Sequence, residues 1–147
     1  MKSRQWFALL LLLALCGGST ASAQTAEDYD KIKATALDYV EGWYEGNGER
    51  MRRSLHPDLV KRIVVGENGA RRIQQMGAEQ LVRGTASGIG KQTPRERQVK
   101  NVQVLDVFGN AAAVRAEMAD WIDYMQIAKF DDRWLIVNVL WERKPSR

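Results

Sequence analysis

The sequence predicts an α+β fold in which a curved antiparallel sheet is covered by three helices from the N-terminal half of the chain. Three observations support this prediction. Apolar residues recur at helical spacing between residues 29 and 43, turn-forming pairs such as Asn68-Gly69 and Gly109-Asn110 separate short segments, and the last third of the chain consists of strand-like segments. Helices and antiparallel hairpins that occupy different parts of one chain are typical of α+β proteins.

The first 23 of the 147 residues are typical of a secretory signal peptide. Two basic residues precede an apolar run at residues 6–16, and Ala21-Ser22-Ala23 offers the small residues that a signal peptidase requires. The run is too short to span a bilayer comfortably, although an uncleaved anchor is the alternative. We therefore expect cleavage near Ala23, a periplasmic or secreted product, no stable membrane insertion after cleavage, and one domain over residues 24–147.

The composition left after cleavage argues against several kinds of site. Removal of residues 1–23 takes away Cys16, which is the only cysteine, and lowers the formal net charge from +4 to +2. Without cysteine there is no thiol nucleophile and no disulfide, and the single histidine, His56, argues against a metal site. A charge of +2 gives no case for nucleic acid. We expect no metal, no cofactor and no nucleic-acid partner.

A first helix is predicted to begin near Thr25, where Thr25 and Asp28 resemble a capping box. Gly46-Asn47-Gly48 is expected to end it, because both residue types tolerate positive φ. One face of this helix is apolar, with spacings of three and four residues. The face comprises Tyr29, Ile32, Ala36, Val40 and Trp43.

Two shorter helices are predicted at about residues 49–55 and 78–87. Pro57 ends the first of them, because a proline pushes the preceding residue toward extended geometry. Gly88 and Gly90 close the second. The strand segments are residues 59–65, 71–76, 98–108, 111–118, 122–130 and 134–141.

Four motifs carry a resemblance to a known family. They are Leu55-His56-Pro57-Asp58, residues 105–112 across a hairpin, Trp121-Ile122-Asp123-Tyr124, and residues 133–141. In this order and spacing they resemble the nuclear transport factor 2-like (SnoaL-like) superfamily, and within it the bacterial proteins described as "Putative lumazine-binding". The resemblance covers nearly all of residues 24–147. It implies a cone made of a curved sheet and three helices, with a pocket inside.

The same superfamily includes ketosteroid isomerase-like enzymes, so the resemblance allows a test for catalysis. It places Tyr39 where those enzymes hold an oxyanion-stabilising tyrosine. An alignment without gaps places Ile63 and Gln126 at the positions of the carboxylate base and the buried acid that the chemistry also needs. Isoleucine cannot take a proton and glutamine cannot supply an acid, which argues against that mechanism.

Other polar residues have both a functional and a structural interpretation. His56 beside Asp58 forms a candidate general base, although His-Pro-Asp also has turn chemistry at a helix end. Asp123 is either a binding group at the mouth of the cone or a residue that bonds backbone amides at a strand corner. Lys61-Arg62 is predicted to lie on a solvated face, because acidic residues are interleaved with the basic ones in this part of the chain.

Strand alternation predicts which side chains line the interior. The set is mostly apolar, with a few hydrogen-bonding tips, as in many ligand pockets and also in packed cores. It leaves an open pocket and a filled interior as alternatives. The predicted lining is Tyr39, Trp43, Ile63, Val114, Ala116, Met118, Ile122, Tyr124, Gln126, Val139 and Trp141.

Three hypotheses about function follow. The first is an exported module that binds a small apolar or aromatic molecule, without a cofactor and without catalysis. The alternative is an isomerase, dehydratase or cyclase that uses Tyr39 together with His56 or Asp58. The third, which the resemblance implies, is an interaction domain that forms a homodimer through its sheet.

Overall fold

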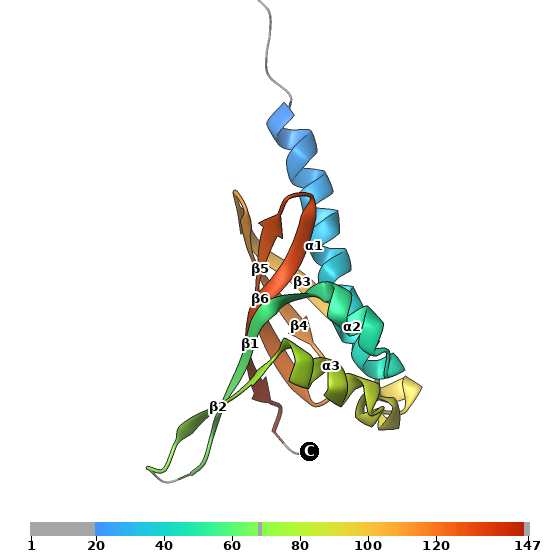
Figure 1. Cartoon of the computed structure of the whole chain (residues 1–147), viewed down its shortest axis with the longest axis vertical. Coiled ribbons are helices and arrows are strands. Elements are labelled where there is room, and N and C mark those ends of the chain that lie inside the picture. Colours follow the sequence, from blue (N-terminus) through green and yellow to red (C-terminus); the bar gives the residue numbers. More distant parts are fainter. Residues whose placement is uncertain (1–19, 68, 146–147) are drawn as a thin grey trace, which may run out of the picture.

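The computed structural model describes residues 20–67 and 69–145 of the chain (Figure 1). Most of the predicted signal peptide, residues 1–19, lies outside the described residues. The helices are α1 (Thr20–Glu45), α2 (Gly48–Ser54) and α3 (Ala78–Ala86), with 3₁₀ turns η1 (Ile89–Gln92) and η2 (Arg95–Arg97). The strands are β1 (Leu55–Val65), β2 (Arg72–Gly77), β3 (Asn101–Phe108), β4 (Ala111–Glu117), β5 (Trp121–Phe130) and β6 (Arg133–Arg143). The predicted α+β fold, with three helices in the N-terminal half, is confirmed.

Helix α1 begins earlier than predicted. The helix starts at Thr20, so the predicted capping box at Thr25 lies inside it. The carboxylate of Asp28 instead accepts hydrogen bonds from Lys129 Nζ at 2.9 and 3.1 Å and from Trp134 Nε1 at 3.0 Å. These contacts tie α1 to the last two strands, and a side chain committed to them is not available to cap a helix.

The glycines after α1 end the helix as predicted. Gly46 has φ of +63°, a conformation that glycine adopts without steric cost. Asn47 then caps α2, since its side-chain oxygen accepts a hydrogen bond from the backbone N–H of Arg50 at 3.0 Å. Leu55 is extended and begins β1 directly after α2.

The sheet has six strands in the order β2-β1-β6-β5-β4-β3. Neighbouring strands are antiparallel except β1 and β6, which are parallel. The sheet is therefore mixed, and the prediction of a purely antiparallel sheet is wrong at this one pair. Hairpin signals in a sequence identify strands that follow each other along the chain, whereas β1 and β6 are far apart in sequence.

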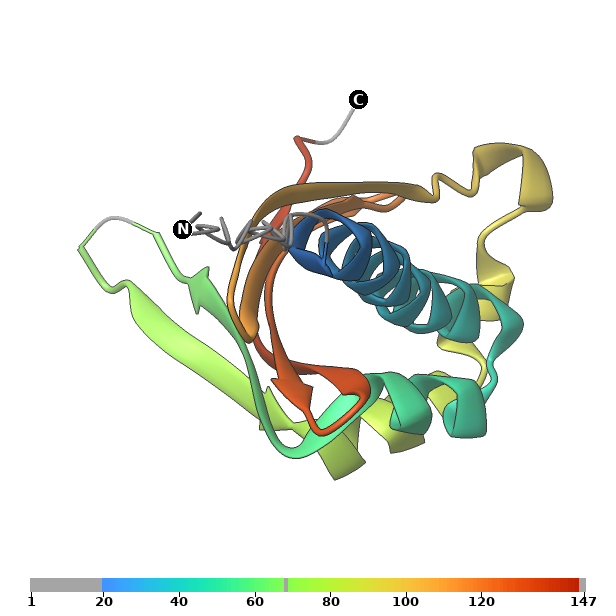
Figure 2. The same ribbon diagram turned by 90° about the horizontal axis from the view of Figure 1, so that it is seen from above.

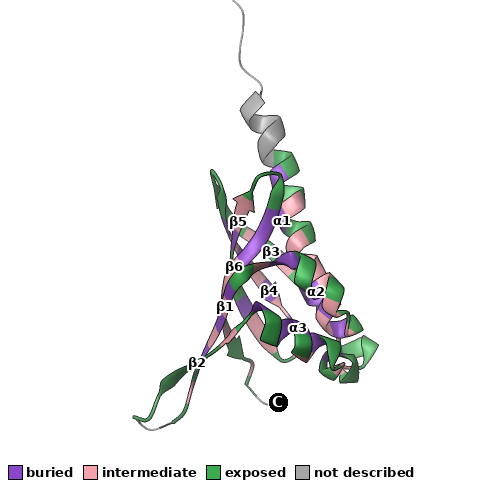
Figure 3. Ribbon diagram, in the orientation of Figure 1, coloured by how far each residue is buried: buried purple, intermediate pink, exposed green. Residues whose placement is uncertain are grey.

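The sheet curves around α1 without closing (Figure 2). Three shifts of register accompany the curvature, in the β1–β6, β3–β4 and β5–β6 pairs. Such irregularities bend a strand and increase its twist. The β1–β2 hairpin extends away from the body of the molecule, and most of β2 is exposed (Figures 1 and 3).

The hydrophobic core lies between α1 and the concave face of the sheet (Figure 3). Ile32, Ala36 and Val40 are fully buried on the inner face of α1, as the helical spacing predicts. Tyr29, which was predicted on the same face, is 44% exposed, because Asp28 occupies the inward position one turn before Ile32. In the part of the chain that is described, no helix has the length and apolar character needed to cross a membrane.

Candidate functional site

A cavity of about 380 Å³ lies where the C-terminal half of α1 and helix α3 meet the concave side of the sheet. Its walls come from α1, α3, η1, the strands β1, β2, β5 and β6, and the turn before β5. The lining residues are Tyr39, Trp43, Lys61, Met76, Gln80, Leu81, Gly84, Ile89, Met118, Trp121, Trp141 and Arg143. Most of the exposed lining is apolar, and a cluster of buried polar side chains lies against one wall.

Two other hollows are candidate sites. One, of about 480 Å³, lies on the convex face of the sheet beside Arg62 and Tyr124. The other, of about 390 Å³, lies between α2, α3 and the start of β6. Among the described lining residues of these two hollows, none is a buried ionisable side chain. The chemistry therefore favours the cavity beside α1.

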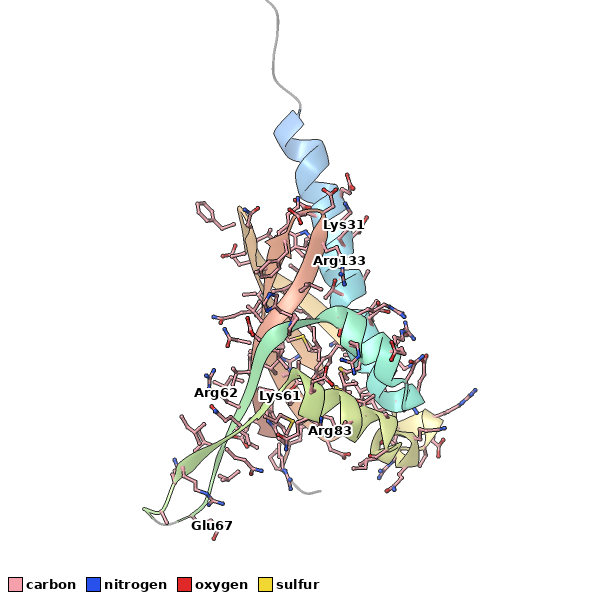
Figure 4. All side chains as sticks on the ribbon, in the orientation of Figure 1. Lys31, Lys61, Arg62, Glu67, Arg83 and Arg133 are labelled. Atoms are coloured by element: carbon pink, nitrogen blue, oxygen red, sulfur yellow. The ribbon has the colours of Figure 1, made fainter. Side chains whose placement is uncertain are left out.

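Lys61 is the unexpected member of this cavity. Only 5% of the residue is exposed, and its amine donates a hydrogen bond to Tyr39 Oη at 2.5 Å. The strand explains its position: Leu59, Lys61 and Ile63 alternate inward along β1, while Arg62 points to the opposite side (Figure 4). The prediction that Lys61 lies on a solvated face is therefore wrong. The alternation of the strand, and not the charge of the residue, determines which face the side chain occupies.

Asp123 is the acidic partner that stabilises the buried amine of Lys61. The residue is fully buried, its Oδ1 pairs with the amine of Lys61, and its Oδ2 accepts from Trp121 Nε1 at 3.1 Å. Asp123 thus bonds side-chain donors, which differs from the backbone amides expected of a residue that shapes a strand corner. Its hydrogen bonds engage both carboxylate oxygens, as a buried charge requires.

Burial changes the acid–base properties of the cluster formed by Tyr39, Lys61 and Asp123. Loss of hydration lowers the pKa of Lys61, and the nearby Asp123 carboxylate opposes this effect. Burial, followed by the negative charge of Asp123, raises the pKa of the Tyr39 phenol well above its usual value. Tyr39 therefore remains a protonated hydrogen-bond donor at physiological pH. Transfer of one proton from Lys61 to Asp123 would exchange an ion pair for a neutral pair without changing the net charge.

Three tryptophans form the aromatic part of the cavity. The ring centroids of Trp43 and Trp121 lie 5.5 Å apart, those of Trp121 and Trp141 lie 5.9 Å apart, and both pairs meet edge to face. The amine of Lys61 is 4.9 Å from the centroid of Trp141. Edge-to-face packing is a favourable arrangement of aromatic rings, and it joins the three tryptophans into one wall of the cavity.

The turn η1 closes the cavity next to Trp43. Gly90 is buried in this turn, and a Cβ atom built on it would collide with the carbonyl group and side chain of Trp43. Only glycine allows this close approach of two backbones. Gly84 in α3 also lines the cavity, but a Cβ atom there would meet open space.

The predicted interior residues fall into three groups. Four of them line the cavity: Tyr39, Trp43, Met118 and Trp141. Four others are buried in the surrounding core and do not line the cavity: Ile63, Val114, Ala116 and Val139. Side chains thus fill part of the interior, and an open space remains at the end of the cone that holds the polar cluster.

The third group is Ile122, Tyr124 and Gln126, which lie on the convex face of the sheet. Tyr124 is 49% exposed, and Gln126 accepts a hydrogen bond from Asn138 Nδ2 at 3.0 Å on the outer side. The inward residues of β5 are Asp123, Met125 and Ile127. The prediction assigned the wrong face because a buried aspartate looked like a solvent-facing residue, and a shift of one residue reverses every side chain of a strand.

His56 and Asp58 do not join Tyr39. The His56 ring stacks on Phe130 with 4.5 Å between centroids, and the Asp58 side chain is 92% exposed. Neither residue lines the cavity, and both precede Lys61 at the far end of β1. The predicted catalytic set of Tyr39 with His56 or Asp58 is therefore not assembled. Among the described residues, no group of three or more histidine, cysteine or acidic side chains is placed to hold a metal ion.

Comparison with known proteins places these features in context. The model of the family described as "Putative lumazine-binding" matches residues 27–142. A curated protein from Cladobotryum, named "Aldolase FrzH", is 26% identical over 129 residues, which cover 82% of this chain and 95% of the relative.

Solved structures share the fold at low identity. A nuclear transport factor 2-like protein of unknown function from Shewanella baltica has a TM-score of 0.67 at 17% identity, with 82% of this chain and 97% of that chain covered. A ketosteroid isomerase-like protein from Erwinia carotovora has a TM-score of 0.54 at 14% identity, with 82% and 98% covered. These likenesses support the architecture and are silent on ligand and reaction.

Proposed function

From the premise that this chain belongs to the family described as "Putative lumazine-binding", in the nuclear transport factor 2-like superfamily, we propose that it is an exported module that binds a small apolar or aromatic molecule in the cavity beside α1. One observation carries the proposal. The buried cluster of Tyr39, Lys61 and Asp123 lies against a cavity whose other walls are mainly aromatic and aliphatic.

The energetics of the cluster favour a ligand over a purely structural role. Burying an ion pair costs several kcal/mol of hydration free energy for each ion, and apolar residues of similar volume often stabilise a core better. A buried lysine and aspartate therefore stabilise the interior less than apolar side chains of the same volume would. Lys61 lies at the cavity wall with Asp123 behind it, which supports the interpretation that the pair orients a polar group of a bound molecule.

Size and composition are consistent with this role. Small-molecule sites usually occupy roughly 300–1,000 Å³ and combine apolar walls with a few placed polar groups. The cavity of about 380 Å³ lies at the lower end of that range, so it fits a compact molecule of one or two rings. Trp43, Trp121 and Trp141 would contact the ring system, and the amine of Lys61 and the hydroxyl of Tyr39 would contact an oxygen atom.

Intrinsic tryptophan fluorescence tests the proposal, because three tryptophans line the cavity. We expect bicyclic aromatic probes, lumazine among them, to quench or shift this fluorescence in a saturable titration. Replacement of Gly84 by phenylalanine should fill the open space beside α3 and weaken binding by more than about tenfold, which corresponds to about 1.4 kcal/mol.

The matched control is Arg83→Phe, which adds the same ring to an exposed position of the same helix. It should bind as the unmodified chain does. If none of the probes gives a saturable signal, or if Gly84→Phe and Arg83→Phe bind equally well, this cavity is not the binding site.

Export is a separate part of the proposal and rests on the signal-peptide pattern of residues 1–23. We expect the processed protein in the periplasm or the medium, with Gln24 at its N-terminus. Intact-mass measurement of fractionated cells checks this. Recovery of an unprocessed chain from the cytosol would contradict it.

Self-association through the sheet is the remaining part. Leu105, Tyr124 and Leu140 leave apolar surface on the convex face, which supports a homodimer through that face. Sedimentation equilibrium should then give twice the monomer mass, and Tyr124→Lys should restore the monomer. A monomer at high protein concentration would refute the homodimer and leave the binding proposal intact.

The alternative function, an enzyme, would require other residues than those predicted from the sequence. Tyr39 contacts Lys61, and neither His56 nor Asp58 lines its cavity, so any chemistry would use Tyr39, Lys61 and Asp123. The relative named as an aldolase supports carbonyl compounds as a class of ligand to test.

A further inference from the structure

We infer that Lys61 is a nucleophilic amine that condenses with an aldehyde or ketone group of the bound ligand and holds it as an iminium ion. This inference rests on the proposed function, because it requires a ligand in the cavity beside α1, and it names the chemical class of that ligand. The amine lies at the cavity wall, is almost completely buried, and is held between Tyr39 and Asp123.

An amine attacks a carbonyl only in its neutral form, so the ammonium proton needs an acceptor. Asp123 Oδ1 pairs with the Lys61 amine and is that acceptor. Burial away from water favours the neutral amine, which agrees with the lowered pKa of Lys61. A desolvated lysine in an apolar pocket is a recognised way to activate an amine for this chemistry.

Tyr39 supplies a donor for the oxygen atom of the carbonyl. Its oxygen accepts from Lys61, and its own O–H, which is drawn toward the Asp123 carboxylate, would turn to donate to the carbonyl oxygen of the ligand. A carbonyl carbon placed next to the Lys61 nitrogen would bring the carbonyl oxygen within reach of this phenol. The aromatic wall of Trp121 and Trp141 would hold the rest of the ligand, as in the binding proposal.

The step balances without an oxidant or a reductant. Lys61 gives a proton to Asp123, its lone pair forms a C–N bond, and the carbonyl oxygen takes up the proton from Asp123. The carbinolamine nitrogen then returns a proton to Asp123, which transfers it to the leaving hydroxyl group, and water departs. In the net reaction, one ammonium ion and one carbonyl group give one iminium ion and one water molecule. The Asp123 carboxylate therefore faces a cation both before and after the reaction.

Six other lysines are described, and four of them pair with a carboxylate, whereas Lys33 and Lys91 are exposed at the surface. Lys31 pairs with Glu27, Lys100 with Glu41, Lys129 with Asp28 and Lys144 with Glu117. The side chain of Lys31 is 40% exposed and its pKa is raised, chiefly by the hydrogen bond to Glu27. A carbonyl reagent should therefore select Lys61, especially near neutral pH.

Reductive trapping tests the inference. The purified chain is incubated with 2-naphthaldehyde and sodium cyanoborohydride, which reduces an iminium ion to a stable amine. Intact mass gives the number of naphthylmethyl groups, and peptide mapping gives their positions. We expect one group on Lys61, formed severalfold faster than on any other lysine, because burial lowers the pKa of Lys61 and so raises its fraction of free amine.

A matched compound separates this inference from the binding proposal. 2-Naphthalenemethanol has the same rings and no carbonyl, so it should bind by fluorescence and slow the trapping by competition. Binding of the alcohol without an adduct on Lys61, or with adducts spread evenly over the lysines, overturns the iminium and leaves the binding module. Absence of both binding and adduct overturns both.

Two variants complete the test. Lys61→Met removes the amine with little change in length and should abolish the fast adduct, whereas Lys100→Met, at a half-exposed surface position, should leave it unchanged. Because the position of the adduct is mapped in the unmodified chain, poor folding of Lys61→Met does not weaken the outcome.

Discussion

The amine of Lys61 lies 2.5 Å from the phenol oxygen of Tyr39, a contact that joins the first strand to the first helix across 22 residues of sequence. Asp123, 62 residues beyond Lys61, completes the cluster from the fifth strand. Three elements of the cone therefore meet through ionisable side chains at the point where the interior is open. The proposed ligand site and the packing of these three elements therefore share the same three residues.

The coupling between Lys61 and Asp123 leads to a double-mutant prediction. Lys61→Met should lower the free energy of unfolding by about 3–5 kcal/mol, because it leaves the Asp123 carboxylate buried without a cation. Adding Asp123→Leu should recover most of this loss, since the pair is then replaced by apolar groups. Urea denaturation of the four proteins measures the coupling. Additive losses in the double variant would show that the two residues do not act as a pair.

The sequence predicted the frame of this site better than its chemistry. Periodicity located α1, α3 and all six strands and assigned Trp43 to the interior, whereas the family resemblance placed Tyr39 there. Lys61 was placed on a solvated face, and Asp123 was placed either at the mouth of the cone or at a strand corner. A charged residue is inward only when its partner is also inward, and that pairing depends on strands far apart in sequence.

The same reasoning explains two errors in the sheet. Strand alternation placed Ile122, Tyr124 and Gln126 inward. In β5 the inward position between Ile122 and Tyr124 belongs instead to Asp123, a charged residue that sequence reasoning assigns to the solvent side. The parallel pairing of β1 with β6 left no local signal, since no hairpin connects these strands. The signal that could have identified the site is a pair of residues of opposite charge at strand positions that face inward together.

The face assignment of β5 can be tested by two neighbouring substitutions. Met125→Ala should cost about 2–5 kcal/mol of stability, because Met125 is 1% exposed within the core. Tyr124→Ala should cost much less, since that ring is half exposed on the convex face. Thermal or urea unfolding at low protein concentration distinguishes the two. Equal losses would mean that the inward and outward residues of β5 are interchanged.

The contact of Asp28 with Lys129 and Trp134 predicts a dependence of stability on pH. Hydrogen bonds from Lys129 and then Trp134 lower the pKa of Asp28 below its ordinary value of 3.8. A carboxyl group with a lowered pKa stabilises the folded state above the unfolded pKa, and this contribution is lost as the pH falls through the folded pKa. Asp28→Asn should therefore lower Tm at neutral pH, by an amount that shrinks as the pH falls below about 4.

The control for this measurement is Asp30→Asn, an exposed residue on the same helix. It should change Tm little at any pH in the series. A constant Tm difference between the unmodified chain and Asp28→Asn from pH 7 to the acid limit would show that the loss comes from packing and not from the charge of Asp28.

The two glycines at the cavity, Gly84 and Gly90, should respond in opposite ways to the same substitution. Gly90→Ala should destabilise the fold by about 1–3 kcal/mol and disturb ligand binding, because the added methyl group collides with the carbonyl of Trp43 and forces η1 away from α1. Gly84→Ala should stabilise α3 by roughly 0.5–1 kcal/mol, since the methyl group meets open space within a helix. Urea denaturation and the fluorescence titration measure both effects. If Gly90→Ala is as stable as Gly84→Ala, η1 does not pack against Trp43, and the wall of the cavity is not closed at that point.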